Sequence, residues 1–504
     1  MTLMISAGSK WRPVLFASLL LVFTVSVVLL NPAHAQFQNV RIISIDKFTD
    51  PDTQHRSEVE PDTFSWGNTI VSTYHVGRRP PPGWGSAAIG FSTSTDGGKT
   101  WTYGYLPGLT VNYKGGTYYG AADPSVAYDA KHGVWMISTL PLVDPIGDVA
   151  VSLSTDGIHW GNPIPIDTTH DDDKNWTVCD NTATSPFYGN CYTEWDAALS
   201  TGWVLMSVSS DGGKTWTAGK PTADHAGGLG GQPLVQPNGT VVVPFEGFGI
   251  DTFSSTDGGK TWSASKTIAT LTSHADAAIR NPNLPSAEID ASGKIYVVWA
   301  DCRFRSGCAE NDIVMSTSTD GNTWSSPVRI PIDPTSSTVD HFIPGIGVDH
   351  STSGNTAHLT LLYYYYPVSN CSSSTCQLDV GFVGSNDGGG TWTAGKKIAG
   401  PMQLSWLPDS DLGPMVADYV SVSYTNGHPW GVFAVAEAPA NGLLRDTMAT
   451  TKRTLDSSAS EPRFSSANDK PIPGAKSDHE MKFYYDDEGR FPMRRSSTSP
   501  DSGK

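Results

Sequence analysis

Ser94-Thr95-Asp96-Gly97-Gly98-Lys99-Thr100-Trp101 is the stretch that decides the fold, because its pattern, Ser-x-Asp-x-Gly-x-Thr-Trp, recurs along the chain. Further copies occupy Ser154 to Trp160, Ser209 to Trp216, Ser255 to Trp262, Ser318 to Trp324 and Ser385 to Trp392, the first and fourth of these being one residue shorter. Six copies of one motif indicate a repeat architecture, which has to be interpreted before any single segment.

The composition of one copy predicts a tight turn between two strands. Asp-Gly between apolar runs is a hairpin signal, because Gly accepts a positive φ and Asp can bond the amides that follow it. The Ser or Thr hydroxyl can cap further turn amides, and the Trp begins the next strand, where its ring can pack between sheets. Each copy therefore reads as a staple that closes one hairpin.

The interval between copies sets the size of the repeating unit. The six motif Asp residues follow one another at intervals of 46 to 67 residues, which suits one four-stranded sheet with its loops. Low charge (16%) with 51 Gly and 35 Pro also favours short strands joined by turns over helix bundles. The sequence therefore predicts an all-β protein built as a β-propeller.

Two segments without a motif complete this prediction. Residues 415–453 contain three strand-like runs but no Asp-Gly turn, while Val40 to Asp46 has no sheet of its own. The latter resembles Val328 to Asp333, which follows a motif Trp and should be a fourth strand. We expect the N-terminal run to complete the last sheet, which gives six motif blades plus one composite closing blade, seven in all. A six-bladed ring with the C-terminal strands packed outside it is the alternative.

The two ends of the chain differ from the rest. Residues 1–35 read as a secretory signal peptide, with Lys10 and Arg12 before an apolar run and Ala33-His34-Ala35 as the cleavage site. Residues 36–453 form the predicted propeller, and 454–504, rich in Ser, Asp, Lys and Pro, a disordered polar tail. Removing the signal peptide changes the formal charge from −17 to −19, which disfavours nucleic acid and anionic lipid as partners.

The six cysteines fit a secreted protein, because they fall into three pairs that are close in sequence, and no pair has the CxxC spacing of a metal site. We expect three loop disulfides, within the set Cys179, Cys191, Cys302, Cys308, Cys371 and Cys376. No cofactor is predicted. The run Asp171-Asp172-Asp173 offers oxygen ligands for Ca²⁺, but a solvated acidic loop is the more frequent explanation of such a run.

The repeated motif resembles the Asp box of sialidases and of the broader Asp-box (BNR-repeat) families. The chain is also similar to secreted bacterial sialidase-like proteins in Asp301-Cys302-Arg303, Asn311-Asp312-Ile313 and Ala417-Asp418-Tyr419. The resemblance implies that each box lies between the third and fourth strands of a blade, on the face away from the active site. The box acids are then structural, and chemistry belongs to the opposite loop face.

A sialidase-like site implies residues of three kinds. Tyr419 is positioned as the nucleophile, Glu246 or Glu288 as the group that activates it and Asp123 as the acid. An arginine cluster would hold the substrate carboxylate bidentately, and the candidates are Arg56 or Arg78, Arg280 or Arg303, and Arg445. Asp301, Arg303 and Asp312 have a second interpretation, a loop salt bridge beside the Cys302–Cys308 pair.

Two functions follow from these residues. The first is a secreted sialidase-like glycoside hydrolase acting on an acidic sugar of extracellular glycans. The second is a non-catalytic propeller that binds glycan or protein through its loop face, as Asp boxes also occur outside enzymes. The only Arg-Ile-Pro triplet, at Arg329 to Pro331, follows a box instead of lying near the first blade, where sialidases carry it. In either case we expect a monomer with no membrane association after signal cleavage.

Overall fold

The structure, a computed structural model, describes residues 39–143, 146–198, 200–456 and 461–475. Within these residues the protein is built of strands, with only three short 3-10 turns, η1 (Ser306–Cys308), η2 (Gly354–Thr356) and η3 (Leu404–Trp406). The predicted all-β class is confirmed. The predicted signal peptide, residues 1–35, lies outside the described residues.

The strands form successive four-stranded antiparallel units in chain order. The first three units are linked into one large sheet, because β4 pairs with β6 and the long β9 serves two units. Their strands are β2 (Glu58–Trp66), β3 (Thr69–Arg78), β4 (Ser86–Ser94), β5 (Thr102–Tyr105), β6 (Gly120–Asp129), β7 (Val134–Val143), β8 (Ile146–Ser154), β9 (Ile164–Cys179), β10 (Cys191–Ala197), β11 (Val204–Ser209) and β12 (Lys220–Pro221).

The following units are separate four-stranded sheets. Their strands are β13 (Leu234–Val235), β14 (Val241–Glu246), β15 (Ile250–Ser255) and β16 (Lys266–Ala269), then β17 (Ser286–Ile289), β18 (Ile295–Asp301), β19 (Asp312–Ser318) and β20 (Val328–Arg329), then β21 (Asp340–Val348), β22 (Leu359–Tyr366), β23 (Gln377–Ser385) and β25 (Lys396–Gln403). Val328-Arg329 is thus a fourth strand, as predicted.

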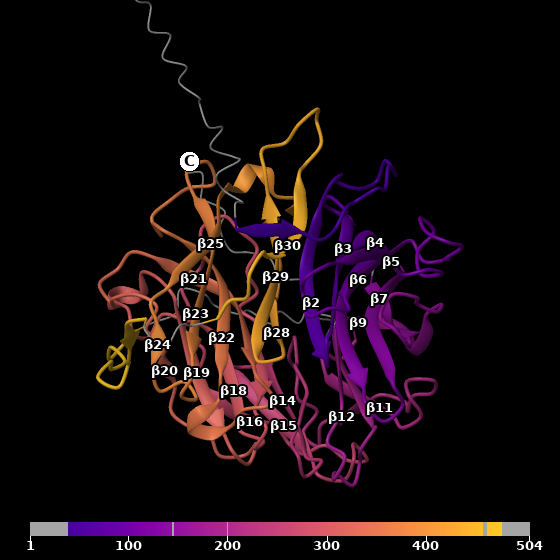
Figure 1. Cartoon of the computed structure of the whole chain (residues 1–504), viewed down its shortest axis with the longest axis horizontal. Coiled ribbons are helices and arrows are strands. Elements are labelled where there is room, and N and C mark those ends of the chain that lie inside the picture. Colours follow the sequence, from indigo (N-terminus) through magenta and orange to yellow (C-terminus); the bar gives the residue numbers. More distant parts are fainter. Residues whose placement is uncertain (1–38, 144–145, 199, 457–460, 476–504) are drawn as a thin grey trace, which may run out of the picture.

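The last unit joins the two ends of the ordered chain. β28 (Ser421–Thr425), β29 (His428–Ala436) and β30 (Asp446–Thr451) are completed by β1 (Val40–Ile42), which pairs antiparallel with β30, Val40 opposite Thr451. The predicted composite sheet is therefore confirmed. β2 of the first unit contacts β28, β29 and β30, so the beginning and end of the strand order lie side by side (Figure 1).

The motif turns connect the third and fourth strands of their units. In the turn between β15 and β16, Asp257 Oδ1 accepts the backbone N–H groups of Lys260 and Thr261, each at 3.0 Å. Asp257 Oδ2 accepts the Thr261 hydroxyl at 2.7 Å, and Ser255 Oγ accepts the Gly259 N–H at 2.9 Å. Gly258 and Gly259 have φ of 74° and 77°, as the turn requires. The motif is a turn staple, as its composition predicts.

Side chains link the first strands of neighbouring units where no sheet ladder does. Asp62 Oδ2 accepts a hydrogen bond from the Val126 N–H at 2.7 Å. In the same way, Ser125 Oγ accepts the Thr177 N–H at 3.0 Å, and Gln232 Oε1 accepts the Ala287 N–H at 2.8 Å. At the meeting of last and first units, Ser421 donates to the Thr63 carbonyl at 3.2 Å. A cavity of about 340 Å³ is lined by residues of β2, β6, β9, β13, β17 and β21 and by Val420 and Ser421. These strands therefore surround one central axis.

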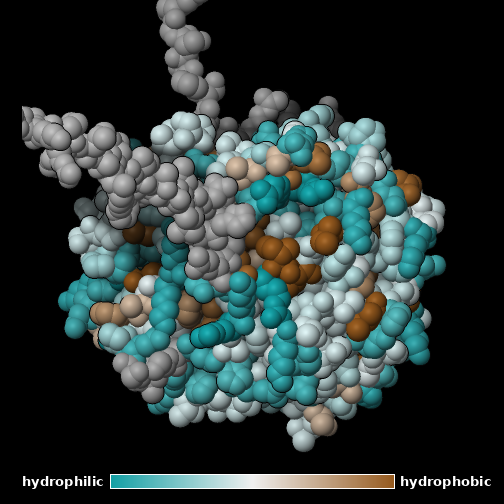
Figure 2. All heavy atoms as spheres, turned by 45° about the horizontal axis from the view of Figure 1, so that its top comes forward, coloured by the Kyte–Doolittle hydropathy of each residue, from teal (hydrophilic) through white to brown (hydrophobic). Residues whose placement is uncertain are grey.

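All three expected disulfides form, between Cys179 and Cys191, Cys302 and Cys308, and Cys371 and Cys376. Among the described residues no helix has the length and apolarity needed to span a bilayer. The face shown in Figure 2 is mostly hydrophilic, with hydrophobic residues in small separate groups.

Residues 461–475 of the predicted polar tail are among the described residues. β31 (Arg463–Phe464) pairs with β24 (Trp392–Thr393), and Arg329 contacts Asp469 at 3.5 Å. Residues 463–469 therefore contact β24 and Arg329, and the disordered tail from residue 454 onward stays a prediction. Two further short strands, β26 (Asp409–Ser410) and β27 (Gly413–Pro414), pair with each other in the loop before β28.

Candidate functional site

Irregular first strands aim charged side chains at the axis. The β2–β3 register shifts between Val59 and Asp62, and the β6–β7 register shifts between Ala122 and Ser125. At these bulges Glu60 (φ 56°) and Asp123 (φ 43°) are left-handed, and Lys174 in β9 has φ 49°. A bulge re-aims the side chain it carries, and left-handed non-glycine residues gather at functional sites. Three neighbouring strands thus each present one charged group.

Lys174 is the centre of this group, which we call the axial cluster. Its Nζ lies 2.5 Å from Asp418 Oδ2, 3.3 Å from Asp123 Oδ1 and 3.6 Å from Glu60 Oε1. The lysine is almost fully buried, which alone would lower its pKa. The surrounding carboxylates, Asp123 foremost, outweigh burial and hold the pKa of Lys174 well above its usual range.

Asp418 also receives an arginine. Arg280 Nε donates to Asp418 Oδ1 at 2.6 Å, and Arg280 Nη2 bonds Asp418 Oδ2, a bidentate pair. Burial favours the neutral carboxyl, but Arg280 and then Lys174 outweigh it and lower the pKa of Asp418. The guanidinium of Arg280 is therefore engaged within the protein.

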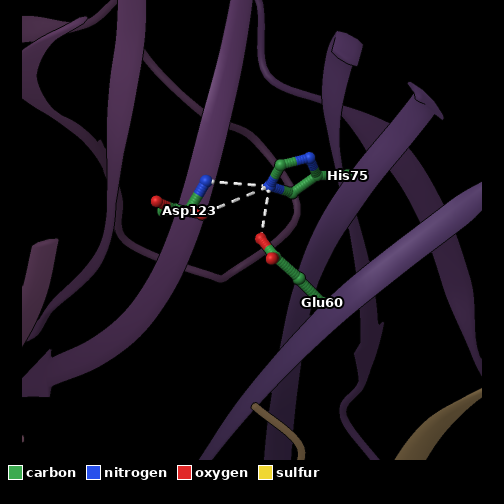
Figure 3. Close-up of side chains that lie close together, drawn as sticks. All are labelled: Glu60, His75 and Asp123. Atoms are coloured by element: carbon green, nitrogen blue, oxygen red, sulfur yellow. Dashed lines mark hydrogen bonds and ion pairs between the residues drawn. The ribbon is translucent and has the colours of Figure 1, made fainter. Parts of the chain in front are cut away.

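Glu60, His75 and Asp123 converge beside this ion pair (Figure 3). His75 Nε2 lies 2.8 Å from Glu60 Oε2 and accepts the Asp123 N–H at 2.8 Å. Burial lowers the pKa of His75, but the Glu60 carboxyl outweighs it, so the pKa is raised. Their spacing would suit a metal ion. However, the Lys174 ammonium already balances the charge of Glu60 and Asp123, and His75 Nε2 already accepts a hydrogen bond from the Asp123 N–H. We therefore assign no metal to this group.

The pKa values of Asp123 and Asp173, the two carboxyls nearest solvent, are shifted in opposite directions. The pKa of Asp123 lies well below its usual range, because Lys174 outweighs the effect of burial. Burial and the adjacent Asp123 charge raise the pKa of Asp173 to about 7, and its side chain is partly exposed. At neutral pH this arrangement places an ionised carboxylate next to a carboxyl that can donate a proton.

Tyr419 lies against the axial cluster. Its ring stands edge-on to Trp176 at 5.1 Å, and Lys174 Nζ lies 5.6 Å from the ring centre. The hydroxyl donates to the Pro124 carbonyl at 3.2 Å. Burial, followed by the charges of Glu60 and Asp123, holds the pKa of Tyr419 well above its usual value.

The other predicted site residues lie elsewhere or have other partners. Arg303 forms a bidentate pair with Asp301 through Nε (2.8 Å) and Nη2 (2.6 Å), the loop salt bridge considered above. Arg445 pairs with Glu437, and Arg56 is exposed. Glu246 is fully buried at the end of β14, and its role as activator of Tyr419 stays a prediction.

Of the predicted site residues, the structure brings Asp123, Arg280 and Tyr419 together. It adds residues that the predicted catalytic set omits: Glu60, His75, Asp173, Lys174 and Asp418. A signal for one of them, Glu60, is present in the sequence, and the predicted Asp123 shares it. Glu60-Pro61 and Asp123-Pro124 each place a charged residue before a proline at a first strand, a position that proline biases away from helix.

Comparison with known proteins gives one family match. Residues 147–342 match the family model of the BNR repeat-like domain. Curated proteins give no match.

Solved structures give similar chains at low identity. A protein of unknown function from Dyadobacter fermentans is 16% identical, with 69% of this chain and 100% of that chain covered and a TM-score of 0.42. The NanB sialidase from Streptococcus pneumoniae is 15% identical (82% and 70% covered, TM-score 0.41), and a leech intramolecular trans-sialidase 14% identical (84% and 70%, TM-score 0.39). The chain carries a BNR repeat-like domain, and its predicted resemblance to Asp-box (BNR-repeat) proteins is confirmed for residues 147–342.

Proposed function

We propose that the protein is a secreted glycoside hydrolase that acts on extracellular glycans at the axial cluster. The observation that carries this proposal is the Asp123–Asp173 pair, whose environments separate the pKa values of two adjacent carboxyls. Most glycoside hydrolases use one proton donor and one ionised carboxylate at a single bond.

The roles follow from the two environments. Asp173, protonated up to about pH 7 and partly exposed, donates its proton to the glycosidic oxygen. Asp123, kept ionised by Lys174 at 3.3 Å, stabilises the developing positive charge of the sugar or accepts a proton from the attacking water. Lys174 and the Arg280–Asp418 pair hold Asp123 in place. Tyr419 as nucleophile, with Glu246 as its activator, is the sialidase version of the same proposal.

The sialidase version needs a carboxylate-binding arginine cluster. Among the described residues, two of the candidate arginines, Arg78 and Arg280, lie near the axial cluster. Arg78 Nη1 donates to the backbone carbonyls of Arg79 and Gly85, and Arg280 is engaged by Asp418. An acidic sugar is therefore the less supported substrate class, and a sialoside belongs in the test as one of several glycosides.

The test is hydrolysis of a panel of fluorogenic glycosides, a sialoside among them, by the purified protein. We expect release from at least one substrate. Asp123→Asn and Asp173→Asn should each lower kcat by about 10²–10⁴-fold, while Asp52→Asn, in an exposed loop, should leave it unchanged. Activity that survives both axial substitutions would place the chemistry elsewhere and overturn the proposal.

The alternative, a non-catalytic propeller that binds glycan or protein, is favoured by one specific observation. Glu60, His75 and Asp418 are each no more than 2% exposed, as expected of charges that only hold strands together. Glycan binding without release of any fluorogenic group, in protein shown to be folded, would favour this alternative.

The architecture and location form part of the same proposal. We take the four-stranded units from β2–β5 through β28–β30 with β1 as seven blades of one closed ring, supported by the contacts of β2 with the last unit and by the shared central cavity. Secretion is supported by the three disulfides, which persist in oxidising compartments. We propose a monomer with glycan partners and no resident cofactor.

A further inference from the structure

The central cavity extends toward the face that carries the motif turns. Its volume is about 340 Å³, and its lining includes Trp66 and Cys179, which end the first strands β2 and β9 of their units. First and third strands of an antiparallel unit run in the same direction, so first strands end on the side where the motif turns follow the third strands. Glu60, Asp123 and Lys174 of the axial cluster are not among the described residues that line it. The cavity is therefore a second concave site, separate from the proposed catalytic pair.

Two acidic side chains from different units line this cavity. Asp62 belongs to β2 and Glu288 to β17, and the charge of Glu288 is close enough to act on Asp62. Asp62, 2% exposed, accepts the Val126 N–H at 2.7 Å, and Glu288 Oε2 lies 3.2 Å from His350 Nε2. Asp290, the third acid of the lining, already binds several N–H and hydroxyl groups. His350 is the one basic side chain in the described lining, so acids outnumber bases there.

An amide in the wall has a donor for which the protein supplies no acceptor. Gln232 Oε1 accepts the Ala287 N–H at 2.8 Å, which identifies the other terminal atom as the amide nitrogen. Within the described part of the chain nothing accepts a hydrogen bond from Gln232 Nε2, although the residue is only 7% exposed and lines the cavity. Buried donors are nearly always paired. The amide therefore indicates a hydrogen-bond acceptor on the molecule that occupies the cavity.

Aromatic side chains complete the wall. Phe64, Trp66 and Trp176 line the cavity together with the two acids. Trp66 is 43% exposed at the end of β2, whereas Trp176 lies nearer the axial cluster, with its ring edge-on to Tyr419. Aromatic rings attract cations through their negative faces, Trp most strongly. Carboxylates and indole rings around one cavity favour a cation that is organic and carries apolar surface.

The size of the cavity and the spacing of its acids distinguish between cations. A volume of about 340 Å³ is at the lower end for small-molecule sites and equals that of roughly ten water molecules in the liquid. Among the described residues, the groups spaced closely enough to ligate a metal are Glu60-His75-Asp123 and Asp312-Asp333-His341, and neither includes Asp62 or Glu288. A small organic cation is therefore a better fit than a metal ion.

We propose that the central cavity binds a small free amino alcohol. Its ammonium group lies between Asp62 and Glu288, against the aromatic wall, and its hydroxyl oxygen accepts the N–H of Gln232. An ammonium that carries methyl groups suits the aromatic rings, and its positive charge balances the two acids. The inference goes beyond the proposed function, because the cavity shares no residue with the axial cluster or with the catalytic pair.

The test compares two ligands that share a shape and differ in charge. Choline is the cation, and 3,3-dimethylbutan-1-ol replaces its nitrogen by carbon. In calorimetric titration of the purified protein at about pH 8, choline should bind at least about ten-fold more tightly than the neutral alcohol. Glu288→Gln and Asp62→Asn should each remove this preference, and Asp52→Asn, in an exposed loop, should retain it. Asparagine at position 62 keeps an oxygen that can accept the Val126 N–H, so this variant should fold, which circular dichroism melting checks.

Affinity for choline should increase with pH. Burial and the nearby Glu288 charge raise the pKa of Asp62 to about 7, although hydrogen bonds from two backbone N–H groups and the Ser421 hydroxyl oppose this shift. Asp62 is then ionised at about pH 8 and mostly protonated at about pH 6, where a protonated His350 also competes with the ligand for Glu288. We expect binding to be about ten-fold tighter at about pH 8 than at about pH 6.

Several results would overturn this inference. These are equal binding of choline and the neutral alcohol, no binding of choline at about 10 mM, an unchanged preference in both acid variants, and stoichiometric binding of Ca²⁺ that both variants remove. If Asp62→Asn does not fold, Glu288→Gln, whose side chain is partly exposed, decides alone. Hydrolysis of the glycoside panel is measured separately, so its absence would leave the assignment of the cavity unaffected.

Discussion

At the scale of single residues, Lys174 holds together more of the site than any other described side chain. One ammonium serves three buried carboxylates that come from β2, from β6 and from the segment before β28. Without it, these carboxylates would face one another across the axis with only Arg280 and His75 to balance them. Buried charges tolerate each other only in such compensated groups, so this lysine matters for stability as well as for Asp123.

Lys174→Met should therefore destabilise the protein by about 3–5 kcal/mol, because it leaves buried carboxylates without their cation. Urea denaturation at neutral pH measures this, with Lys260→Met, in an exposed turn, as the matched control. A loss below about 1 kcal/mol, typical of a surface ion pair, would show that the carboxyls of the axial cluster are protonated and need no ammonium.

The pKa of Asp173 predicts the alkaline limb of the activity profile. As a proton donor the residue must be protonated, and burial with the neighbouring Asp123 charge raises its pKa to about 7. We therefore expect kcat/KM to fall as pH rises through about 7. A pH series with the best substrate of the panel measures this, and a rate that still increases beyond pH 8 would exclude Asp173 as the acid.

At the scale of elements, each motif turn concentrates several hydrogen bonds on one carboxylate. Asp257 accepts two backbone N–H groups and two hydroxyls, from Ser255, Lys260 and Thr261. These bonds favour the ionised form and lower the pKa of Asp257 to about 2, although partial burial opposes them. The turn is thus fixed by charge-assisted bonds within eight residues, independently of the sheet around it.

Asp257→Ala should cost about 1–3 kcal/mol, because at least one amide of the turn loses its acceptor. Asp257→Asn, which keeps an acceptor oxygen, should cost less. Thermal melting of both variants measures the difference, and hydrolytic activity should remain unchanged, since the turn lies away from the axial cluster. Equal destabilisation by both substitutions would mean that the negative charge, rather than the acceptor, holds the turn.

The same locality explains what could be predicted from the sequence. A motif turn depends on residues within one stretch, so it can be predicted from its Asp, Gly and Trp. The composite sheet can be predicted from the likeness of Val40–Asp46 to Val328–Asp333. The axial cluster depends on bulges, which shift register without a strong residue signature. In the sequence, Lys174 only follows a run of acidic residues. Its role as the counter-ion of Glu60 and Asp123 becomes visible when β9 packs beside β2 and β6 in the structure.

The arginines show the same limit. The sequence does not distinguish the roles of Arg280, Arg303 and Arg445. In the structure, Arg280 pairs with Asp418, Arg303 with Asp301 and Arg445 with Glu437. Asp301 lies two residues from Arg303, so that pair could be anticipated, whereas Asp418 lies far from Arg280 along the chain. The packing of the four-stranded units determines which charges pair over long range. Hydrophobic periodicity in the sequence does not predict this packing.

At the scale of the whole molecule, a buried carboxyl sits where the last unit meets the first. Glu58 in β2 accepts the Met448 N–H of β30 at 2.9 Å and the hydroxyl of Ser44. Burial raises the pKa of Glu58 to about 8, against the weaker opposing effects of these bonds, and Asp46, Tyr74 and Asp446 lie near enough to interact with it. The stability of the join between β2 and β30 therefore depends on pH below about 8.

Glu58→Gln should stabilise the protein at neutral pH. The unfolded carboxyl ionises near pH 4.5 while the folded one stays protonated to about pH 8, so wild-type stability falls as pH rises between these values. At pH 7 the accumulated difference is roughly 3 kcal/mol at about 1.4 kcal/mol per pH unit. Melting temperatures of both proteins across this range measure it. A constant difference at every pH would show that Glu58 ionises normally in the folded protein.

The pairing of β1 with β30 also has a consequence for how the protein is made. The first of the described strands to be synthesised has its hydrogen-bonding partner among the last. Until β30 appears, β1 is an exposed edge, and any prematurely terminated chain keeps that edge for good. Incomplete chains thus carry an exposed strand edge that complete ones lack, which distinguishes them for quality-control proteases.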